Sequence, residues 1–173
     1  MPRFFVEDTA PLGESFALVG EDARHISLSL RMRAGDTVTV CDAAGRAVLC
    51  SLEQLSPEAV LCRVLEELPS AHELPVSVRL YQGCPKGEKL ELIVQKATEL
   101  GASAVIPFIS RRCISRPKAD KHDRMTERLC RIAREAAGQS GRDRLPAVLP
   151  PMSFSAALAD AASASDRILF CYE

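Results

Sequence analysis

The 173-residue sequence contains no tryptophan, only two tyrosines and no long run of apolar residues. Its longest purely apolar stretch, residues 168–172, is far shorter than the roughly 18 residues that a membrane-spanning helix needs. The opening residues are too few and too acidic for a secretory signal peptide. We therefore expect a cytoplasmic protein with no membrane partner.

The seven cysteines form an odd number, and no two of them stand in a Cys-x-x-Cys pair. This argues against a disulfide framework and against a structural zinc site, and it fits a reduced compartment. His25 starts no metal-ligand spacing, so we expect no metal. Gly-x-Gly-x-x-Gly, Walker and Gly-x-Ser-x-Gly motifs are also absent, so no familiar cofactor cradle is visible. The sequence predicts that Cys41, Cys50 and Cys62 are small core residues.

The net charge of -1 hides an uneven distribution of charge. Residues 1–74 carry six Lys/Arg against twelve Asp/Glu, whereas residues 75–173 carry sixteen against eleven. Within the second part, residues 109–144 hold eleven basic and five acidic side chains. A stretch this basic predicts a polyanionic partner.

The first third of the chain has the pattern of a small antiparallel sheet or barrel. Short β-branched and apolar runs, separated by turn residues, predict strands over 37–41, 46–52 and 59–65. Residues 21–32 predict one inserted helix, in which Ile26 and Leu30 share a face. The two prolines within residues 66–75 mark a linker.

After the linker the pattern changes to alternating strands and helices. We predict strands over 76–81, 104–108, 147–149 and 167–172, and helices over 86–100, 121–137 and 153–162. Gly101 and Gly138 are placed to end the first two helices, and Ser153 to cap the third. The apolar stripes of the first two helices are Leu90, Ile93, Val94, Ala97 and Leu100, then Met125, Leu129, Ile132, Ala133 and Ala136. Such alternation predicts a parallel sheet covered by helices.

The helix predicted over 121–137 carries the strongest functional pattern. Arg124, Arg128, Arg131 and Glu135 recur on one side of it, and Gln139, Ser140 and Arg142 follow. Arginine forks suit phosphate oxygens, and a glutamate can hold such a fork in place. The alternative is a ladder of surface ion pairs through Glu127, Arg131 and Glu135. That ladder leaves unexplained the upstream Arg111, Arg112, Arg116, Lys118 and Lys121.

Lys86, Lys89 and Lys96 form a second basic group, on the helix predicted over 86–100. Cations near a helix N-terminus oppose the helix dipole, which is tolerated more readily when they face a phosphate. Solvated lysines on an exposed face explain the pattern equally well, so both interpretations stay open.

With these segments described, the chain resembles the ribosomal RNA small subunit methyltransferase E family, within the SPOUT class of knotted methyltransferases. Pro107, Arg111 and Pro146 fall where the family also places them. The resemblance spans the whole chain in the family's order and is carried by four islands: Arg3-Phe4-Phe5; His25 with Leu30-Arg31 and Gly35-Asp36; Lys86-Gly87 with residues 89–91 and 95–101; and Arg131-Ile132 with residues 135–137, Gln139-Ser140 and Arg142.

The resemblance implies an α+β two-domain fold. A PUA-like, RNA-binding β-barrel is expected over residues 1–70, followed over 75–173 by an α/β SPOUT domain, Rossmann-like and normally trefoil-knotted. It implies a homodimer that transfers a methyl group from S-adenosylmethionine to N3 of a uridine in 16S ribosomal RNA of the small subunit. Since N3 must lose its proton and lies on the pairing edge, catalysis would rest on positioning an unstacked base.

The predicted sites combine the resemblance with the basic groups described above. Because residues 1–74 are acidic, we expect the RNA contact of the barrel to be local, around Arg31 and Arg33. The catalytic residues we predict are Arg131, Glu135, Gln139 and Arg142, and the RNA-binding residues are His25, Arg31, Lys86, Lys89, Lys96, Arg111, Arg112, Arg124 and Arg128.

The last residues of the chain carry a further expectation. Family members are implied to continue through a Gly-Pro-Glu-Gly-Gly loop and a knotted segment that bind S-adenosylmethionine and form much of the dimer interface. Tyr172 and Glu173 would then mark only the edge of the cofactor site, and we expect an incomplete domain and an inactive fragment. A non-enzymatic RNA-binding module and an unrelated cytosolic α/β enzyme with surface ion pairs are the competing hypotheses.

Overall fold

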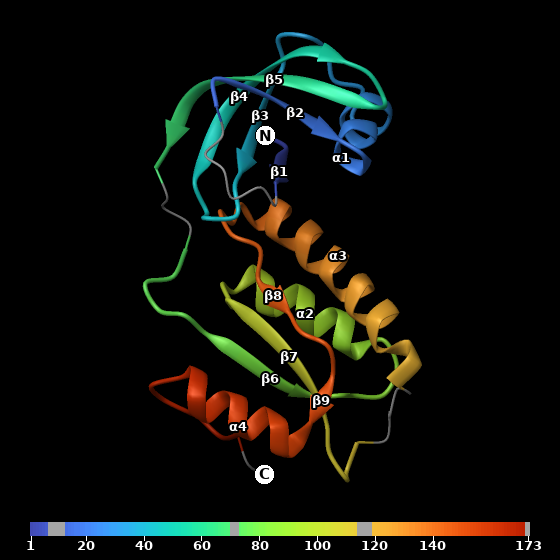
Figure 1. Ribbon diagram of the computed structural model, residues 1–173, viewed down its shortest axis with the longest axis vertical. Helices are drawn as coiled ribbons and strands as arrows, with labels where there is room; N and C mark the ends of the chain where they lie inside the picture. Colours follow the sequence, from blue (N-terminus) through green and yellow to red (C-terminus); the bar gives the residue numbers. More distant parts are fainter. Residues whose placement is uncertain (7–12, 70–72, 114–118, 172–173) are drawn as a thin grey trace. The chain divides into compact units, whose positions relative to one another are not determined.

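The computed structural model describes residues 1–6, 13–69, 73–113 and 119–171, and it divides into two compact units (Figure 1). The first unit comprises Met1–Leu74 together with Ala137–Leu145, and the second comprises Pro75–Ala136 together with Pro146–Glu173. The first unit therefore includes a short segment from late in the sequence, which no change in composition predicts.

The first unit is built on a five-stranded sheet. Its strands are β1 (Arg3–Phe5), β2 (Ser15–Val19), β3 (Thr37–Cys41), β4 (Ala47–Leu55) and β5 (Ala59–Leu68). They lie in the order β1-β3-β4-β5-β2, antiparallel except for the parallel pair β1 and β3. Two register shifts interrupt the pairing of β4 with β5. Such irregularities bend and twist a strand, and Figure 1 shows this sheet curved on itself.

One face of this curved sheet forms an apolar core. Strands β3, β4 and β5 place alternate residues inward, as their period-two pattern predicts. The most buried members are Val38, Val40, Cys50, Leu52, Val60 and Cys62, each no more than 2% exposed. Burying each large aliphatic side chain contributes roughly 1.5–3 kcal/mol. The prediction that the three strand cysteines are core residues is confirmed.

The helix predicted over residues 21–32 is shorter and wider than its pattern indicates. A short α1 (Glu21–Arg24) continues as a π-helical turn, η1 (His25–Ser29). The N–H of Leu30 donates to the carbonyl of His25, five residues earlier, at 2.9 Å. The π-helical turn has more residues per turn and breaks the α-helical spacing, and Leu30 lies at its C-terminal end; Ile26 is buried but Leu30 is 40% exposed. The prediction that these two residues share an inward face is therefore wrong.

The second unit contains the predicted parallel sheet. Strands β6 (Arg79–Gly83), β7 (Ala104–Ile109) and β8 (Ala147–Val148) lie in that order, and β9 (Met152–Ser153) also pairs with β7. Helix α2 (Lys89–Glu99) connects β6 to β7. The 3₁₀ turn η2 (Ala119–Lys121) and helix α3 (His122–Ser140) lie between β7 and β8. Helix α4 (Phe154–Ala164) follows β9, with the Ser153 hydroxyl capping its N-terminus as predicted.

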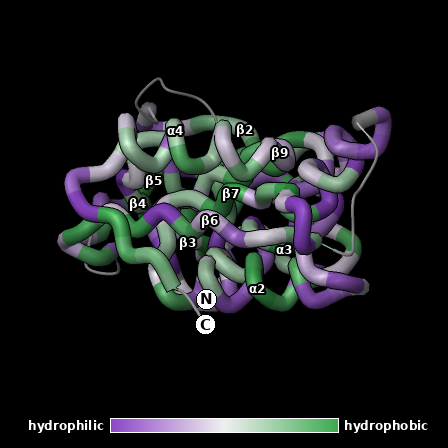
Figure 2. Tube along the Cα trace, turned by 90° about the horizontal axis from the view of Figure 1, so that it is seen from below, coloured by the Kyte–Doolittle hydropathy of each residue, from purple (hydrophilic) through white to green (hydrophobic). Residues whose placement is uncertain are grey.

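Helices cover both faces of this sheet. On one face, Val105 of β7 packs in a single cluster with Leu90 and Val94 of α2 and with Leu129 and Ala133 of α3. On the other face, the ring of Phe108 lies 5.3 Å from that of Phe154 in α4, measured between centroids. Figure 2 shows β7 in hydrophobic colours, as expected of a strand covered on both sides. The apolar stripes predicted for α2 and α3 face this core, with one exception: Leu100, which the prediction places in the stripe of α2, is 78% exposed.

Glycines end both helices, though one at a different residue from the prediction. Gly101 has a positive φ of 93° after α2, as predicted. Helix α3 continues through Gly138 to Ser140 and ends at Gly141, whose φ is 75°. There the N–H of Arg142 donates to the carbonyl of Ala137 at 3.0 Å, the bond of a left-handed helix terminus. Helix α2 begins at Lys89 rather than Lys86, because Gly87 turns the chain first.

The strand predicted over 167–172 is not formed in the part that the structure describes, which ends at residue 171. None of the described strands pairs with these residues, and an apolar run without a neighbouring strand does not make a ladder. Ile168, Leu169 and Phe170 are accordingly exposed. No helix in the described part of the chain is long and apolar enough to cross a membrane.

Candidate nucleic-acid interface

Helix α3 carries the row of charged side chains that the sequence predicts. At about 100° per residue, Arg124, Arg128, Arg131 and Glu135 fall within about 60° of one another around the helix axis. All four are exposed, while Leu129 and Ala133 on the opposite side are only 2% exposed. Gln139 is exposed one further turn along the same side. The buried stripe thus fixes the helix rotation and leaves these forks in solvent.

The ion-pair ladder that the same spacing allows does not form. Among the described residues, Arg131 makes no ion pair with Glu127 or Glu135, although both lie one turn away. Arg128 instead reaches α2, where its Nη2 lies 2.9 Å from the carboxylate oxygens of Glu91. Exposed pairs of this kind contribute only about 0–1 kcal/mol. Neutralising adjacent acids therefore does not account for Arg131.

A second basic group lies at the carboxyl edge of the parallel sheet. Lys86 and Lys89 follow β6, and Arg111 and Arg112 follow β7. Parallel strands end at the same edge of a sheet, and in open α/β sheets ligands bind outside that edge. All four side chains are exposed there. Two further basic residues singled out in the sequence, Arg116 and Lys118, lie outside the described residues.

The structure leaves some predicted residues apart from these two groups. The ammonium of Lys96 lies 2.7 Å from Glu99 on α2 and so has an intramolecular partner. His25 and Arg31 belong to the first unit and are both exposed. The His25 ring packs edge-on against Phe4, with 6.3 Å between the ring centroids. Tyr172 and Glu173 lie outside the described residues.

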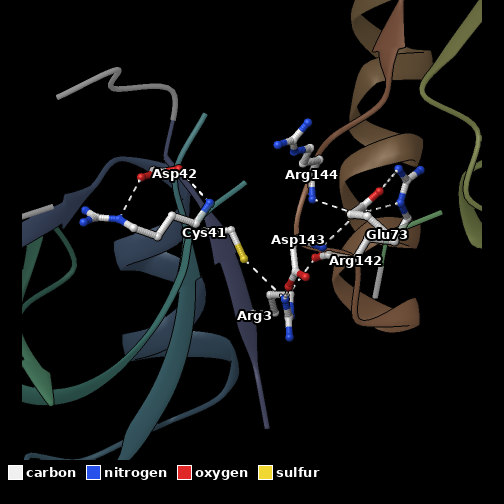
Figure 3. A network of polar contacts seen from close by, with 8 residues as sticks. Arg3, Cys41, Asp42, Glu73, Arg142, Asp143 and Arg144 are labelled. Carbon is white, nitrogen blue, oxygen red and sulfur yellow. Dashed lines mark hydrogen bonds and ion pairs between the residues drawn. The ribbon is translucent and has the colours of Figure 1, made fainter. Parts of the chain in front are cut away.

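Arg142 has a place that the sequence does not predict. Its side chain is 5% exposed, and its guanidinium lies against the carboxylate of Glu73, with Nη2 to Oε2 at 2.6 Å and Nε to Oε1 at 3.2 Å (Figure 3). We predict Arg142 to be a catalytic residue, but the structure does not place it on the exposed face of Arg131. Its charge holds together the first unit instead.

A polar network surrounds this pair. Glu73 also accepts hydrogen bonds from the backbone N–H groups of Asp143 and Arg144, both at 3.0 Å. The Asp143 carboxylate is 1% exposed and lies 2.5 Å from Nη1 of Arg3. That guanidinium donates as well to the Arg142 carbonyl and to Sγ of Cys41. Among the described residues, no buried polar side-chain atom lacks a partner.

The network shifts the acidity of Glu73. Burial alone raises the pKa of a carboxyl group, because it penalises the charged form. The hydrogen bond and charge of Arg142, with the two backbone N–H donors, outweigh this effect and hold the pKa of Glu73 below its usual value. Glu73 is thus held as a carboxylate at neutral pH, and Arg142 keeps a charged partner.

Among the described residues, no buried side-chain nitrogen or oxygen is left without a hydrogen-bond partner. Nor do they bring together three or more side chains that could hold a metal ion. What the described surface offers is exposed cations, which suit the phosphates of a nucleic acid.

Two domain families match the chain. The sequence model of the RNA methyltransferase domain matches residues 72–173, and that of the RNA methyltransferase PUA domain matches residues 18–65. The class is therefore that of RNA methyltransferases with a PUA-like domain and an α/β methyltransferase domain, and the chain belongs, within it, to the ribosomal RNA small subunit methyltransferase E family.

Named relatives agree with this assignment. Ribosomal RNA small subunit methyltransferase E of Bacillus subtilis (strain 168) is 40% identical over 157 residues, which are 89% of this chain and 61% of that protein. The protein of the same name from Synechocystis is 34% identical over 169 residues, which are 98% of this chain and 54% of that protein. The chain thus spans between a half and two thirds of the length of these curated relatives.

Solved structures resemble this fold. The crystal structure of a ribosomal RNA small subunit methyltransferase E from Neisseria gonorrhoeae, bound to S-adenosyl methionine, superposes with a TM-score of 0.83 at 32% identity, covering 91% of this chain and 65% of that one. The putative methyltransferase Lpg2936 from Legionella pneumophila, in complex with its bound cofactor, gives a TM-score of 0.82 at 25% identity over 96% of this chain and 67% of that one. The expected two-domain fold is confirmed.

Proposed function

We propose that the protein methylates N3 of a uridine in 16S ribosomal RNA of the small subunit, in the cytoplasm and as a homodimer. S-adenosylmethionine supplies the methyl group when bound. The observation that carries the proposal is the exposed arginine row of α3, which has a buried face to fix it and, at Arg131, no intramolecular partner among the described residues. The family to which the chain belongs supports the reaction class.

In this proposal the cations of the second unit hold the RNA backbone. Arg124 and Arg131 contact phosphates from α3, and Lys86, Lys89, Arg111 and Arg112 extend the contact along the carboxyl edge of the sheet. Arginine binds a phosphate in a two-pronged geometry that fixes orientation as well as position. Glu135 lies one turn from Arg131 and makes no ion pair with it in this structure, so it orients that guanidinium only once RNA is bound. Gln139 offers an amide to the RNA. Arg128 joins them only after it exchanges Glu91 for a phosphate.

In this reaction, the main contribution of the protein is to position the uridine. N3 of uridine must lose its proton before it attacks, and the base must be unstacked because N3 lies on its pairing edge. Holding the ribose-phosphate on either side of the uridine converts a bimolecular encounter into an oriented one. Arg131 also stabilises the negative charge that develops on the uracil ring as the proton leaves.

The two parts of the chain then divide the work. We assign residues 1–70 to RNA binding by a PUA-like barrel, and residues 75–173 to the methyltransferase domain. His25 and Arg31 are the predicted RNA contacts of the first part. Because residues 1–74 are acidic, their contact with RNA is local.

The experiment supplies the protein with small ribosomal subunits that lack the modification and with S-adenosylmethionine carrying a labelled methyl group. Mass spectrometry of the digested RNA identifies the methylated nucleoside. In contrast to the inactive fragment expected from the resemblance, the proposal predicts 3-methyluridine, and at least about a tenfold loss of rate in Arg131→Ala with unchanged folding. Arg167→Ala, an exposed arginine away from α3, is the matched control. RNA binding without any methyl transfer would replace the proposal with the non-enzymatic RNA-binding module.

A further inference from the structure

Two of the cysteines follow neighbouring strands of the parallel sheet. Cys84 comes directly after β6, and Cys113 comes after β7 at the end of a tight turn, in which its N–H donates to the carbonyl of Ser110 at 3.2 Å. Both thiols are free. Because parallel strands end at the same edge of a sheet, both cysteines lie at the carboxyl edge, where α/β sheets bind their ligands.

One carbonyl group lies between the two cysteines. The N–H of Cys84 donates to the carbonyl of Phe108 at 2.9 Å, and Sγ of Cys113 lies 3.8 Å from the same oxygen. A Cβ atom on Gly83, the residue before Cys84, would also lie 3.8 Å from that Sγ. Disulfides join residues whose Cα atoms are roughly 4.4–6.8 Å apart, a range that includes the spacing of neighbouring strands. The turn after β7 thus lies against the end of β6, as a disulfide between the two segments requires.

The two thiols differ in reactivity, and Cys84 is the less reactive. Its side chain is only 5% exposed. Burial raises the pKa of the Cys84 thiol, and a charge on the neighbouring Cys113 raises it further. Since the thiolate is the nucleophilic form, Cys84 does not react first with a reagent from solvent.

The surroundings of Cys113 favour reaction. This residue is half-buried, and the N–H of Ser110 donates to its Sγ at 3.3 Å. Two exposed arginines directly precede it, and neither residues 79–87 nor residues 104–113 contain an Asp or Glu. Hydrogen-bond donors and positive charge around a sulfur atom favour its thiolate form. Cys113 is therefore the thiol of the pair that an oxidant reaches first.

A second pair of neighbouring cysteines provides an internal comparison. Cys50 of β4 and Cys62 of β5 lie close enough for a charge on one to raise the pKa of the other. Both are 0% exposed in the core of the first unit. Proximity without access leaves such thiols inert in the folded protein, so exposure distinguishes Cys113 from them.

We propose that Cys84 and Cys113 form a thiol pair that peroxides oxidise to a reversible disulfide. The sulfur of Cys113 attacks a peroxide oxygen, so an S–O bond forms, the O–O bond breaks, and the departing hydroxide leaves as water with the thiol proton. Cys84 then loses its proton and attacks the sulfur of Cys113, so an S–S bond forms, the S–O bond breaks and a second water leaves. The two thiols supply both electrons, and a thiol reductant restores them. Disulfides in a reducing compartment are usually of this transient kind.

The disulfide links two segments that carry cations of the proposed RNA contact. Lys86 follows Cys84 by two residues, and Arg112 directly precedes Cys113. Joining the segments restricts how these side chains adapt to an RNA backbone, so oxidation lowers RNA affinity. This consequence rests on the proposed function, whereas the disulfide itself does not.

The first experiment treats the folded chain with hydrogen peroxide and then blocks the remaining thiols with N-ethylmaleimide. Mass mapping of the unreduced digest gives the state of each cysteine. We expect one main cross-linked peptide pair, which contains Cys84 and Cys113, is lighter by two hydrogen atoms than the reduced peptides, and disappears with dithiothreitol. Cys50 and Cys62 stay reduced. Cys130→Ser, which removes an exposed thiol, is the matched control and forms the same cross-link.

Single variants separate the roles of the two thiols. In Cys84→Ser we expect a sulfenic acid on Cys113, which dimedone traps, and in Cys113→Ser we expect Cys84 to stay unmodified. Cys84→Ala repeats the test if serine impairs folding at this buried position, which circular dichroism checks. A cross-link from Cys113 to Cys130 or Cys171 in place of Cys84, or dimedone labelling of Cys84 in Cys113→Ser, would overturn the proposal.

RNA affinity tests the consequence. Fluorescence anisotropy with a short oligouridine compares the reduced and the peroxide-treated protein. We expect oxidised wild type to bind about fivefold more weakly, dithiothreitol to restore the affinity, and peroxide to change the affinity of Cys84→Ser little. Equal affinity of wild type in both states would refute the effect on RNA binding. The cross-link is read from peptide mass alone, so a cross-linked protein without methyl transfer would refute the proposed function and leave the thiol pair.

Discussion

Glu73 binds the segment that follows α3 through both its charge and its acceptor capacity. Its carboxylate accepts from the guanidinium of Arg142 and from the backbone N–H groups of Asp143 and Arg144. Between 69 and 71 residues of sequence separate Glu73 from these partners, so no local pattern relates them. The sequence indicates that Arg142 is a charged residue near a helix end, but it does not indicate that Glu73 is its acidic partner. This is why the sequence predicts a catalytic role for Arg142, whereas the fold buries its side chain against Glu73.

Replacing Glu73 by Gln tests the network. The variant leaves the buried Arg142 charge without a counter-charge, so we expect the free energy of unfolding to fall by about 2–4 kcal/mol at neutral pH. Urea denaturation measures it. The same change at Glu66, an exposed residue of β5, is the control. An equally small change in the free energy of unfolding at both positions would show that Glu73 does not stabilise the fold through this network.

The lowered pKa of Glu73 gives that network a pH dependence. Because the folded-state pKa lies below the ordinary value of 4.5, the stabilisation is fully present above about pH 4.5 and is lost as the pH falls through the folded-state pKa. The stability difference between wild type and Glu73→Gln should therefore shrink on acidification below pH 4.5. A difference that stays constant down to strongly acidic pH would contradict the assignment.

The buried cysteines offer a second prediction at this scale. Burial raises the pKa of the Cys41 and Cys62 thiols to about 11 and that of Cys50 to about 12, so almost no thiolate is present near neutral pH. A thiol-specific reagent should label the exposed Cys130 and Cys171 quickly and the three core thiols only after unfolding. Mass mapping of the labelled sites checks this. Rapid labelling of Cys50 in the native protein would show that the sheet core opens.

The helices of the second unit show how much of an element can be predicted from its own sequence. For each of α2 and α3, one continuous segment contains the apolar period, the glycine near the helix end and the strand before the helix. That segment alone therefore predicts that the helix forms and which of its faces is exposed. The exact ends of the helices are set by which glycine adopts a positive φ. Gly87 does so before α2, which begins at Lys89, and Gly141 rather than Gly138 does so at the end of α3. The π-helical turn η1 and the unformed strand over 167–171 depend on partners elsewhere, which periodicity does not encode.

The capping of α4 can be tested on its own. The Ser153 hydroxyl accepts from the N–H of Ala156 at 3.1 Å and satisfies one of the free donors at the helix start. We expect Ser153→Ala to lower the free energy of unfolding by about 1 kcal/mol. Ser163→Ala, near the other end of the helix, should change it by only a few tenths of a kcal/mol, since its hydroxyl bonds a carbonyl within an exposed turn. Thermal unfolding followed by circular dichroism compares the two.

On the scale of the whole molecule, the order of strands and helices predicts the two parts of the chain, and the resemblance to a known family predicts which folds they are. The sequence could not predict that residues 137–145 belong to the first unit. This depends on contacts of Arg3 and Glu73 with residues about 70 to 140 positions away. The exposed charges of α3 follow from helix geometry alone. The function of these charges depends on a binding partner, so it has to be established by binding measurements.

The salt dependence of RNA affinity tests the central claim most directly, that the arginine row of α3 binds phosphates. For the wild-type chain we predict a steep linear fall of log affinity with log salt, and for the double variant Arg124→Gln, Arg131→Gln a slope smaller by about 2, one unit for each lost phosphate contact. Circular dichroism confirms that the variant keeps its fold. A flat response of the wild type, or an unchanged slope in the variant, would contradict the account.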